Sequence, residues 1–447
     1  MNAAVNVATV QLWGHRVGAV GLDQFDNGVF EYDPEFLKLG LDIAPITMPL
    51  DIARHDPKYS FPSLRPETFK RLPGMLADAL PDKFGQAIVD AWLARQGRAP
   101  EDFSIIERLC YTGKRAMGAL EFQPSSTKNM ETAVDIELDR MVALVRDVIA
   151  KRTSLDATLR EKGNVNQKAL LNILVIGTSA GGARAKAVIA FNESTGQVMS
   201  GQAETPPGFE HWLLKFDGAG DIELGETENY GRIEYAYYLM AKAAGIRMMK
   251  SRLLEENGRA HFITRRFDRV NGEKLHLQSL CAIAHYDFNM AGAYGYEQAL
   301  MIMRKMRLSK KEQLELYRRM VFNVIARNQD DHTKNIAFLM NPQGQWSLSP
   351  AFDMTHSYNP SGQWTSQHQM SINGKRDSFT RDDLLAVARA SDLKHADAVI
   401  DEVQNAVANW TDYAGEAKLN KTRMQAIKKQ HRVLGLQKTP SRSMPGG

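Results

Sequence analysis

Polar and charged side chains crowd into one short segment, residues 329–335, which reads Gln-Asp-Asp-His-Thr-Lys-Asn. Asp330 and Asn335 stand five positions apart, and a further carboxylate, Asp353, follows Phe352 just past an apolar segment. An enzyme that transfers phosphate from a nucleotide needs a carboxylate to accept the hydroxyl proton and oxygen ligands to hold Mg²⁺. Asp330 fits the first task, and Asn335 and Asp353 fit the second. Since the Asp-x4-Asn spacing alone also occurs in ordinary turns, it is the ordered set that predicts phosphoryl transfer.

Two upstream segments supply groups that could meet the phosphates. Residues 177–186 read Gly-Thr-Ser-Ala-Gly-Gly-Ala-Arg-Ala-Lys; their glycines let backbone N–H groups approach phosphate oxygens, although a Gly-Gly pair is also a common turn. Lys215 lies within the apolar segment 211–217, where an ammonium is unfavourable unless anions meet it. Phosphates and Glu234, in a helix expected at 231–244, would be those anions. The alternative is a lysine at a sheet edge that reaches water.

The elements that must position these groups follow from hydrophobic periodicity. Alternating apolar residues predict short strands at 7–13, 17–22, 185–191, 211–217 and 260–267. Helical periodicity predicts helices at 83–95, 134–150 and 231–244, and it dominates after about residue 270. A strand-rich half followed by a helical half predicts a bilobed α+β fold like that of protein kinases, with an all-helical C-terminal lobe. We expect an N-terminal module at 1–150, the nucleotide-binding part of the kinase N-lobe at 151–270, and a helical C-lobe with the catalytic loop and a basic tail at 271–447.

Composition excludes several classes of protein. The chain has 447 residues, 43% of them hydrophobic, which is enough for a large core, and its 56 basic and 52 acidic residues nearly balance. Its two cysteines, Cys110 and Cys281, form neither a disulfide framework nor a metal motif, so we expect buried thiols. No apolar run approaches the ~20 residues of a membrane span, and the first residues lack the pattern of a secretory signal. We therefore expect a soluble, cytoplasmic protein.

Five motifs occur in the order seen in HipA-type serine/threonine kinases, which this chain resembles. They are Gly-Gly-Ala-x-x-Lys, Leu-x-Lys-Phe, Arg-Phe-Asp-Arg (266–269), Asp-x-His-x-Lys-Asn and Pro-x-Phe-Asp. The first part of the chain also resembles the N-terminal module of full-length members, through residues 30–33, 76–84 and 118–120. The resemblance covers most of residues 8–400 and implies a bilobed kinase fold with this extra module.

The resemblance implies a role for each matching position, with ATP and Mg²⁺ as cofactors. Asp330 matches the catalytic base, and Asn335 and Asp353 match the metal ligands. Lys215 matches the lysine that touches the ATP phosphates, and Glu234 is its expected ion-pair partner. Further ATP contacts are implied for the phosphate loop, for the adenine hinge (largely through main-chain groups) and for the catalytic loop: Gly181, Gly182, Ala183, Arg184, Ala185 and Lys186; Arg265, Arg266 and Phe267; His332, Thr333 and Lys334.

Ser179 matches the serine that such kinases autophosphorylate, a modification that expels the phosphate loop and silences the enzyme. Nearly two added negative charges beside this loop would repel ATP. Thr178 is an alternative acceptor, and a turn-stabilising hydroxyl is the alternative role of Ser179.

The sequence departs from the best-known pattern at three places: Arg184-Ala185 in the loop, Arg265 in place of an acidic hinge residue, and Asp331 where some members have a small residue. Asp331 places two carboxylates side by side. The count to Asn335 and the match at His332 favour Asp330 over Asp331 as the base.

Full-length HipA kinases include toxins that phosphorylate aminoacyl-tRNA synthetases and are neutralised by a small helix-turn-helix antitoxin, HipB. The resemblance implies a HipB-like partner and a protein substrate, with DNA contacted only indirectly through basic residues after about 418; a solvated helix is the alternative for those residues. Two other functions stay open: a kinase of a small molecule or lipid, and a non-catalytic transcriptional co-repressor. The second is disfavoured because Lys215, Asp330, Asn335 and Asp353 occur together.

Overall fold

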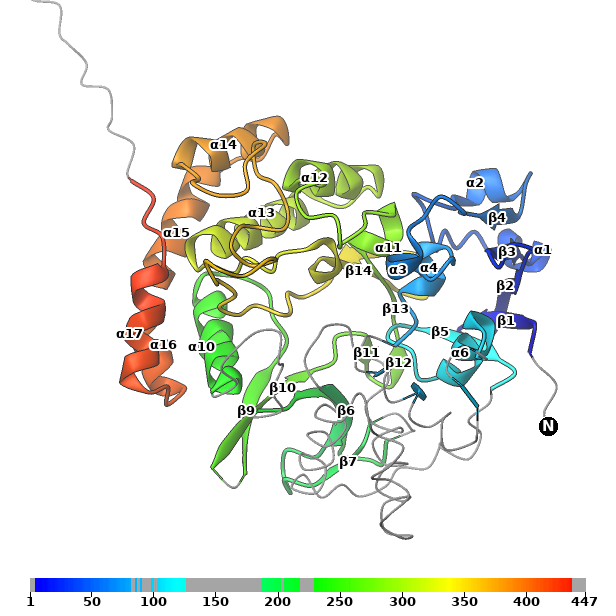
Figure 1. The fold of residues 1–447 in the computed structure, drawn as a ribbon, viewed down its shortest axis with the longest axis horizontal. Helices are drawn as coiled ribbons and strands as arrows, with labels where there is room; N and C mark the ends of the chain where they lie inside the picture. The colour runs from blue at the N-terminus through cyan, green and yellow to red at the C-terminus, as the bar shows by residue number, and fades with distance from the viewer. Residues whose placement is uncertain are drawn as a thin grey trace, which may run out of the picture.

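The computed structural model describes residues 5–81, 85–86, 89–90, 98–99, 101, 103–125, 186–201, 205–217, 229–256 and 258–435. These residues form an N-terminal module, a second sheet and a helical lobe, which lie side by side in Figure 1. None of the helices in these ranges is long and apolar enough to cross a membrane. The phosphate-loop residues 181–185, Ser179 and Thr178 lie outside the described residues, as do the helix expected at 134–150 and most of that expected at 83–95.

The N-terminal module is built on an antiparallel sheet with the strand order β4-β3-β2-β1-β5. Buried and accessible residues alternate along its first strand, as the apolar alternation predicts. Short helices complete a hydrophobic core that includes Val10, Phe30 and the free thiol of Cys110. The strands are β1 (Val7–Leu12), β2 (His15–Leu22), β3 (Gly28–Tyr32), β4 (Lys58–Ser60) and β5 (Leu120–Gln123), and the helices are α1 (Pro34–Lys38), α2 (Leu50–Ala53), α3 (Pro66–Phe69), α4 (Gly74–Ala77) and α6 (Ile105–Thr112).

The second sheet is also antiparallel, with the order β7-β6-β8-β10-β9. Its strands are β6 (Lys186–Phe191), β7 (Val198–Ser200), β8 (Glu210–Lys215), β9 (Ser251–Glu256) and β10 (Arg259–Arg265), so the three strands predicted here are confirmed. Helix α10 (Tyr230–Ala243) packs on β9 and β10. A Cβ on Gly231 would meet the Ala260 carbonyl oxygen at 1.9 Å, so only glycine permits this approach, which places Glu234 next to the sheet.

The C-terminal lobe is helical except for one small sheet. Its helices are α11 (Leu280–Ala284), α12 (Tyr296–Lys305), α13 (Lys310–Ile325), α14 (Arg381–Ala390), α15 (Ala396–Ala408), α16 (Trp410–Glu416) and α17 (Lys421–Gln430). The small sheet has the order β13-β14-β15, from His276–Ser279, Ala337–Met340 and Trp346–Leu348. The prediction of an all-helical lobe was therefore wrong in this detail. Such strands are too short to stand out in a chain read for helical periodicity, and β14 is buried throughout.

Helix α13 is the central element of the lobe and leads straight into the catalytic loop. Ser309 and Glu312 form a capping box that starts the helix. Tyr317, Val321 and Ile325 are buried along one side of the helix and belong to the large hydrophobic core of the lobe. Since residues of α10 join the same core, the helix that carries Glu234 is fixed to the lobe as well as to the second sheet.

A buried carboxylate, Asp268, joins the N-terminal module to the rest of the chain. It accepts hydrogen bonds from the backbone N–H of Gly118 at 2.7 Å, from Arg266 Nε at 2.9 Å and from Arg269 Nη1 at 2.7 Å. Arg269 also donates to the carbonyl oxygens of Gly118 and Ala116. Asp268 lies between β10 and the short hairpin of β11 (Arg269–Val270) and β12 (Glu273–Lys274). The hydrogen-bonded ion cluster therefore holds the N-terminal module against this part of the chain.

Candidate active site

Lys215 lies at the centre of an ion cluster that joins it to Glu234, 19 residues later, and to Asp353, 138 residues later. It ends β8, where Trp212 and Leu214 are buried in the sheet core. Its ammonium group contacts the Glu234 carboxylate on α10 and the Asp353 carboxylate in the segment after β15. The ion pair expected between Lys215 and Glu234 is therefore present, and the buried ammonium has anionic partners as predicted.

A second lysine, Lys186, approaches the same carboxylate. It begins β6 directly opposite Lys215, and its Nζ lies 3.7 Å from Asp353 Oδ2. Burial would lower the pKa of Lys215, but the carboxylates of Asp353 and Glu234 raise it above its usual value. Burial would likewise raise the pKa of Asp353, but the two lysines hold it well below its usual value. Lys215 and Asp353 are therefore both charged at neutral pH.

Asp353 itself has an unusual backbone conformation. Its φ of 53° lies in the left-handed region, which non-glycine residues seldom adopt. The preceding Phe352 packs against Phe267, with ring centroids 5.5 Å apart. Such backbone strain is found at functional sites, where surrounding contacts hold it in place. Here it places the carboxylate against the lysines of the second sheet.

Asp330 opens the catalytic loop with an accessible carboxylate, whose side chain is 48% exposed. Asn335 closes the loop by donating from Nδ2 to the Asp330 backbone oxygen at 2.7 Å. His332 Nε2 lies 3.7 Å from Asp330 Oδ1, and the His332 ring packs against Phe288 at 5.4 Å. Asp330 thus remains available to an incoming hydroxyl group while its backbone is held.

The neighbouring Asp331 points into the lobe. Its carboxylate accepts hydrogen bonds from the Tyr296 hydroxyl at 2.9 Å, from His368 Nδ1 at 2.8 Å and from the Gln369 backbone N–H at 2.8 Å. Burial would raise its pKa, yet these partners, His368 first, lower it. The sequence places two carboxylates side by side, and the structure gives them opposite surroundings. This supports the choice of Asp330 as the residue that meets substrate.

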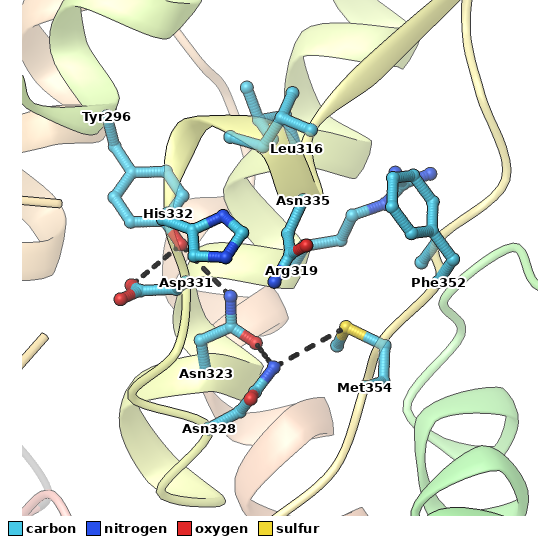
Figure 2. Close-up of a pocket in the computed structure, with 12 residues that line it drawn as sticks. Tyr296, Leu316, Arg319, Asn323, Asn328, Asp331, His332, Asn335, Phe352 and Met354 are labelled. Carbon is cyan, nitrogen blue, oxygen red and sulfur yellow. Dashed lines mark hydrogen bonds between the residues drawn. The ribbon is translucent and has the colours of Figure 1, made fainter. Parts of the chain in front are cut away.

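A small cavity behind the catalytic loop joins it to the segment that carries Asp353. Asp331, His332 and Asn335 line one side, and Phe352 and Met354 line the other. Figure 2 shows Asn328 hydrogen-bonded to Asn323 and to the Met354 sulfur, while the Asp331 carboxylate points toward Tyr296. The cavity therefore lies between the loop that carries Asp330 and the segment that carries Asp353, and of the predicted base and metal ligands only Asn335 lines it.

The remaining predicted contacts are less uniform. Arg266 donates its backbone N–H to the His211 carbonyl at 2.9 Å, but its guanidinium is buried against Asp268. Arg265 forms an ion pair with Glu210 at 2.9 Å. The Thr333 hydroxyl donates to the Tyr286 carbonyl at 2.7 Å, and Lys334 Nζ lies 4.8 Å from the centre of the Phe288 ring. The side chains of Arg266 and Thr333 and the backbone N–H groups of Arg265 and Arg266 are thus used within the fold.

Two protein families match the chain. The family described as HipA N-terminal domain matches residues 8–123, and the family described as HipA-like C-terminal domain matches residues 178–410. The chain belongs to the HipA family. The comparison with curated proteins found no match.

Two solved structures are similar to this chain to different extents. The Shewanella oneidensis MR-1 toxin–antitoxin system HipA, HipB and its operator DNA matches with a TM-score of 0.65 at 16% identity, and 95% of each chain is covered. At this identity the likeness shows the fold, and it confirms the α+β class predicted. The Helicobacter pylori proinflammatory kinase CtkA matches 50% of this chain and 88% of its own at 12% identity, with a TM-score of 0.31 that supports no argument.

The donor atoms of this HipA-family site suit a magnesium ion bound together with phosphates. The Asn335 amide nitrogen is used by the Asp330 backbone, so its oxygen is the atom left to meet a cation. Asp353 supplies a charged carboxylate. Within the described residues no group of three or more His, Cys, Asp or Glu side chains could hold a metal alone. One carboxylate and one amide fit Mg²⁺, which usually keeps waters and substrate phosphates as its other ligands.

Proposed function

We propose that this protein is an ATP- and Mg²⁺-dependent serine/threonine protein kinase. The observation that carries the proposal is the contact of the Lys215 ammonium with both Glu234 and Asp353. Asp353 comes to this contact from 138 residues after Lys215. Phosphotransferases need this set: a cation for the phosphates, an acid on a helix to hold it, and a metal ligand. A site that had lost its activity would have no reason to keep a buried lysine paired with two carboxylates.

Each residue has a distinct part in the proposed reaction. Asp330, accessible and held by Asn335, accepts the proton of the acceptor hydroxyl group. Lys186 and Lys215 bind the phosphates of ATP, and Asn335 and Asp353 hold Mg²⁺. When bound, Mg²⁺ neutralises charge that develops on the transferred phosphoryl group. The hinge at 265–267 binds adenine through main-chain groups.

We further propose a protein substrate, such as an aminoacyl-tRNA synthetase, and neutralisation by a HipB-like antitoxin. Membership of the HipA family supports both, as does the likeness over 95% of the chain to a HipA structure determined with HipB and operator DNA. Autophosphorylation at Ser179, beside the phosphate loop, would silence the kinase because the added charge repels ATP.

Phosphate transfer from γ-labelled ATP by the purified full chain tests the proposal. We expect Mg²⁺-dependent labelling of the protein at the peptide that contains Thr178 and Ser179. Asp330→Gln should lower the rate by about 10³-fold, since its amide cannot accept the proton of the hydroxyl group. In Ser179→Ala, label that persists at this peptide identifies Thr178 as the acceptor.

The wild-type chain, folded yet without ATP turnover, would refute the kinase and favour a transcriptional co-repressor. For the substrate, phosphopeptides from cells that express the wild-type chain are compared with those from cells that express Asp330→Gln. ATP turnover without any new phosphoprotein would point to a small-molecule or lipid acceptor.

A further inference from the structure

The catalytic loop is tied to a segment that follows it by more than thirty residues. His368 is fully buried, and its Nδ1 lies 2.8 Å from Asp331 Oδ2, while Gln369 donates its backbone N–H to Asp331 Oδ1 at 2.8 Å. Both carboxylate oxygens of Asp331 are therefore held from the same short segment. Because Asp331 is covalently next to Asp330, this contact sets the position of the proposed base.

The second ring nitrogen of His368, Nε2, reaches the C-terminal segment. It lies 3.2 Å from Nη1 of Arg432, which follows α17. A guanidinium can only donate, so Nε2 accepts this hydrogen bond and the ring proton on Nδ1 is donated to Asp331. The three side chains form one continuous chain of hydrogen bonds, from the C-terminal segment to the catalytic loop.

Arg432 is itself firmly placed. Its backbone N–H donates to the Ile325 carbonyl at 2.9 Å, and its Nη1 also lies 3.3 Å from the Val324 carbonyl at the end of α13. Its second nitrogen, Nη2, contacts Asp377. Arg327, three residues before Asp330, donates to the Gln430 carbonyl at 2.9 Å. The end of α17 is thus fastened to the end of α13 at the point where the catalytic loop begins.

We infer that Asp331, His368 and Arg432 are positioning residues for the phosphate transfer, and that the C-terminal segment holds the catalytic loop in its working geometry through them. The inference rests on the proposed function. Charged hydrogen bonds in a buried chain are individually strong, and they fix orientation as well as energy. Loss of Arg432 leaves the buried His368 Nε2 without its donor and weakens the support that the ring gives to Asp331 and so to Asp330.

Hydrogen exchange and kinetics on full-length variants test this inference together. Arg432→Ala removes the outer end of the chain, and His368→Asn keeps a donor near Asp331 but cannot reach Arg432. Both should lower kcat about 10- to 100-fold and leave the KM for ATP within about twofold, since they alter the base and not the nucleotide contacts. Amides of residues 326–340 should exchange about 10-fold faster in both variants. The double variant should be little worse than either single one.

Lys429→Ala is the matched control, because Lys429 is an exposed cation on the last turn of α17. It should leave both kcat and exchange within about twofold of the wild type. Folded Arg432→Ala with unchanged kcat, or with unchanged exchange at 326–340, overturns the inference. So does a loss of kcat matched by an equal rise in KM. A wild-type chain without phosphate transfer refutes the proposed function instead, and the exchange measurement alone then decides whether the C-terminal segment holds the loop.

Discussion

Two carboxylates in this molecule, Asp268 and Asp353, each lie between two cations, but they differ in burial and in the type of cation. Asp268, at the junction with the N-terminal module, has a side chain with no exposed surface and is held by Arg266 and Arg269. Asp353, in the candidate active site, has a side chain that is 24% exposed and is held by Lys186 and Lys215. One carboxylate between two cations thus belongs to a structural junction at Asp268 and to a candidate binding site at Asp353.

The kind of cation explains the difference. A guanidinium is a planar fork that bonds a carboxylate in fixed directions, and Asp268 has the Gly118 N–H as a further donor, so its bonds are saturated. An ammonium is a point charge on a flexible stem and can change partners. Lys186 lies 3.7 Å from Asp353, a loose contact that an anionic ligand can replace. Arginine pairs thus mark the fixed junction, and lysine pairs mark the site proposed to bind phosphates.

Asp353→Asn should have the largest effect on activity. The amide keeps the shape of the side chain but carries no charge for Mg²⁺ or for the lysines, so we expect phosphate transfer to fall at least about 10³-fold. Because the two lysines hold the pKa of Asp353 below its usual value, the variant should also lose some stability, but less than Asp268→Asn, since the side chain is 24% exposed and Glu234 still pairs with Lys215. Initial rates with labelled ATP and urea titrations measure the two quantities.

The control for this variant is Asp392→Asn, which neutralises an exposed carboxylate paired with Lys310 at 3.4 Å. It should leave both rate and stability unchanged. Full activity of folded Asp353→Asn would show that the lysine-bound carboxylate is structural, like Asp268.

Asp268→Asn should instead act on stability. The change leaves two buried guanidinium groups without their anion, which costs about 3–5 kcal/mol of unfolding free energy. Burial alone would raise the pKa of Asp268, but Arg266 and Arg269 hold it well below its usual value. Its contribution is therefore present above the unfolded pKa of about 4 and is lost as the pH falls below it toward the folded pKa. Urea unfolding at pH 7 and at pH 3 should show a smaller difference between variant and wild type at the lower pH.

Asp401→Asn is the comparison for that measurement, since Asp401 is half-exposed and pairs with Arg381 at 2.7 Å. It should cost no more than about 1 kcal/mol. If Asp268→Asn unfolds like the wild type but loses phosphate transfer, the junction acts in the reaction and the contrast with Asp353 fails.

Asp353 and Asp268 also show which contacts could be predicted from the sequence and which could not. Asp353 was predicted because it belongs to an ordered set of motifs, and the strands that bring Lys186 and Lys215 to it follow from local apolar runs. The partners of Asp268 and Asp331 were not. Gly118 is 150 residues from Asp268, and His368 lies in an irregular segment with no periodic signal 37 residues after Asp331. Arg266 was assigned to the hinge from its motif, and only the fold shows that its side chain serves the junction.

Glu234→Gln should have a smaller effect than either carboxylate change, and it sharpens the contrast. Lys215 keeps Asp353 as a partner in this variant, but it loses the acid that holds it when Mg²⁺ takes Asp353. Removing one charged hydrogen bond of this kind is worth about 1.5 kcal/mol, or about tenfold in kcat/KM for ATP. Glu255→Gln, an exposed acid paired with Arg232 and Lys418, should change the same constant less than twofold. A tenfold loss confined to Glu234→Gln would show that Lys215 needs a second anion that stays in place when Asp353 binds Mg²⁺. Arg266 and Arg269 have no such need, because they keep Asp268 as their partner.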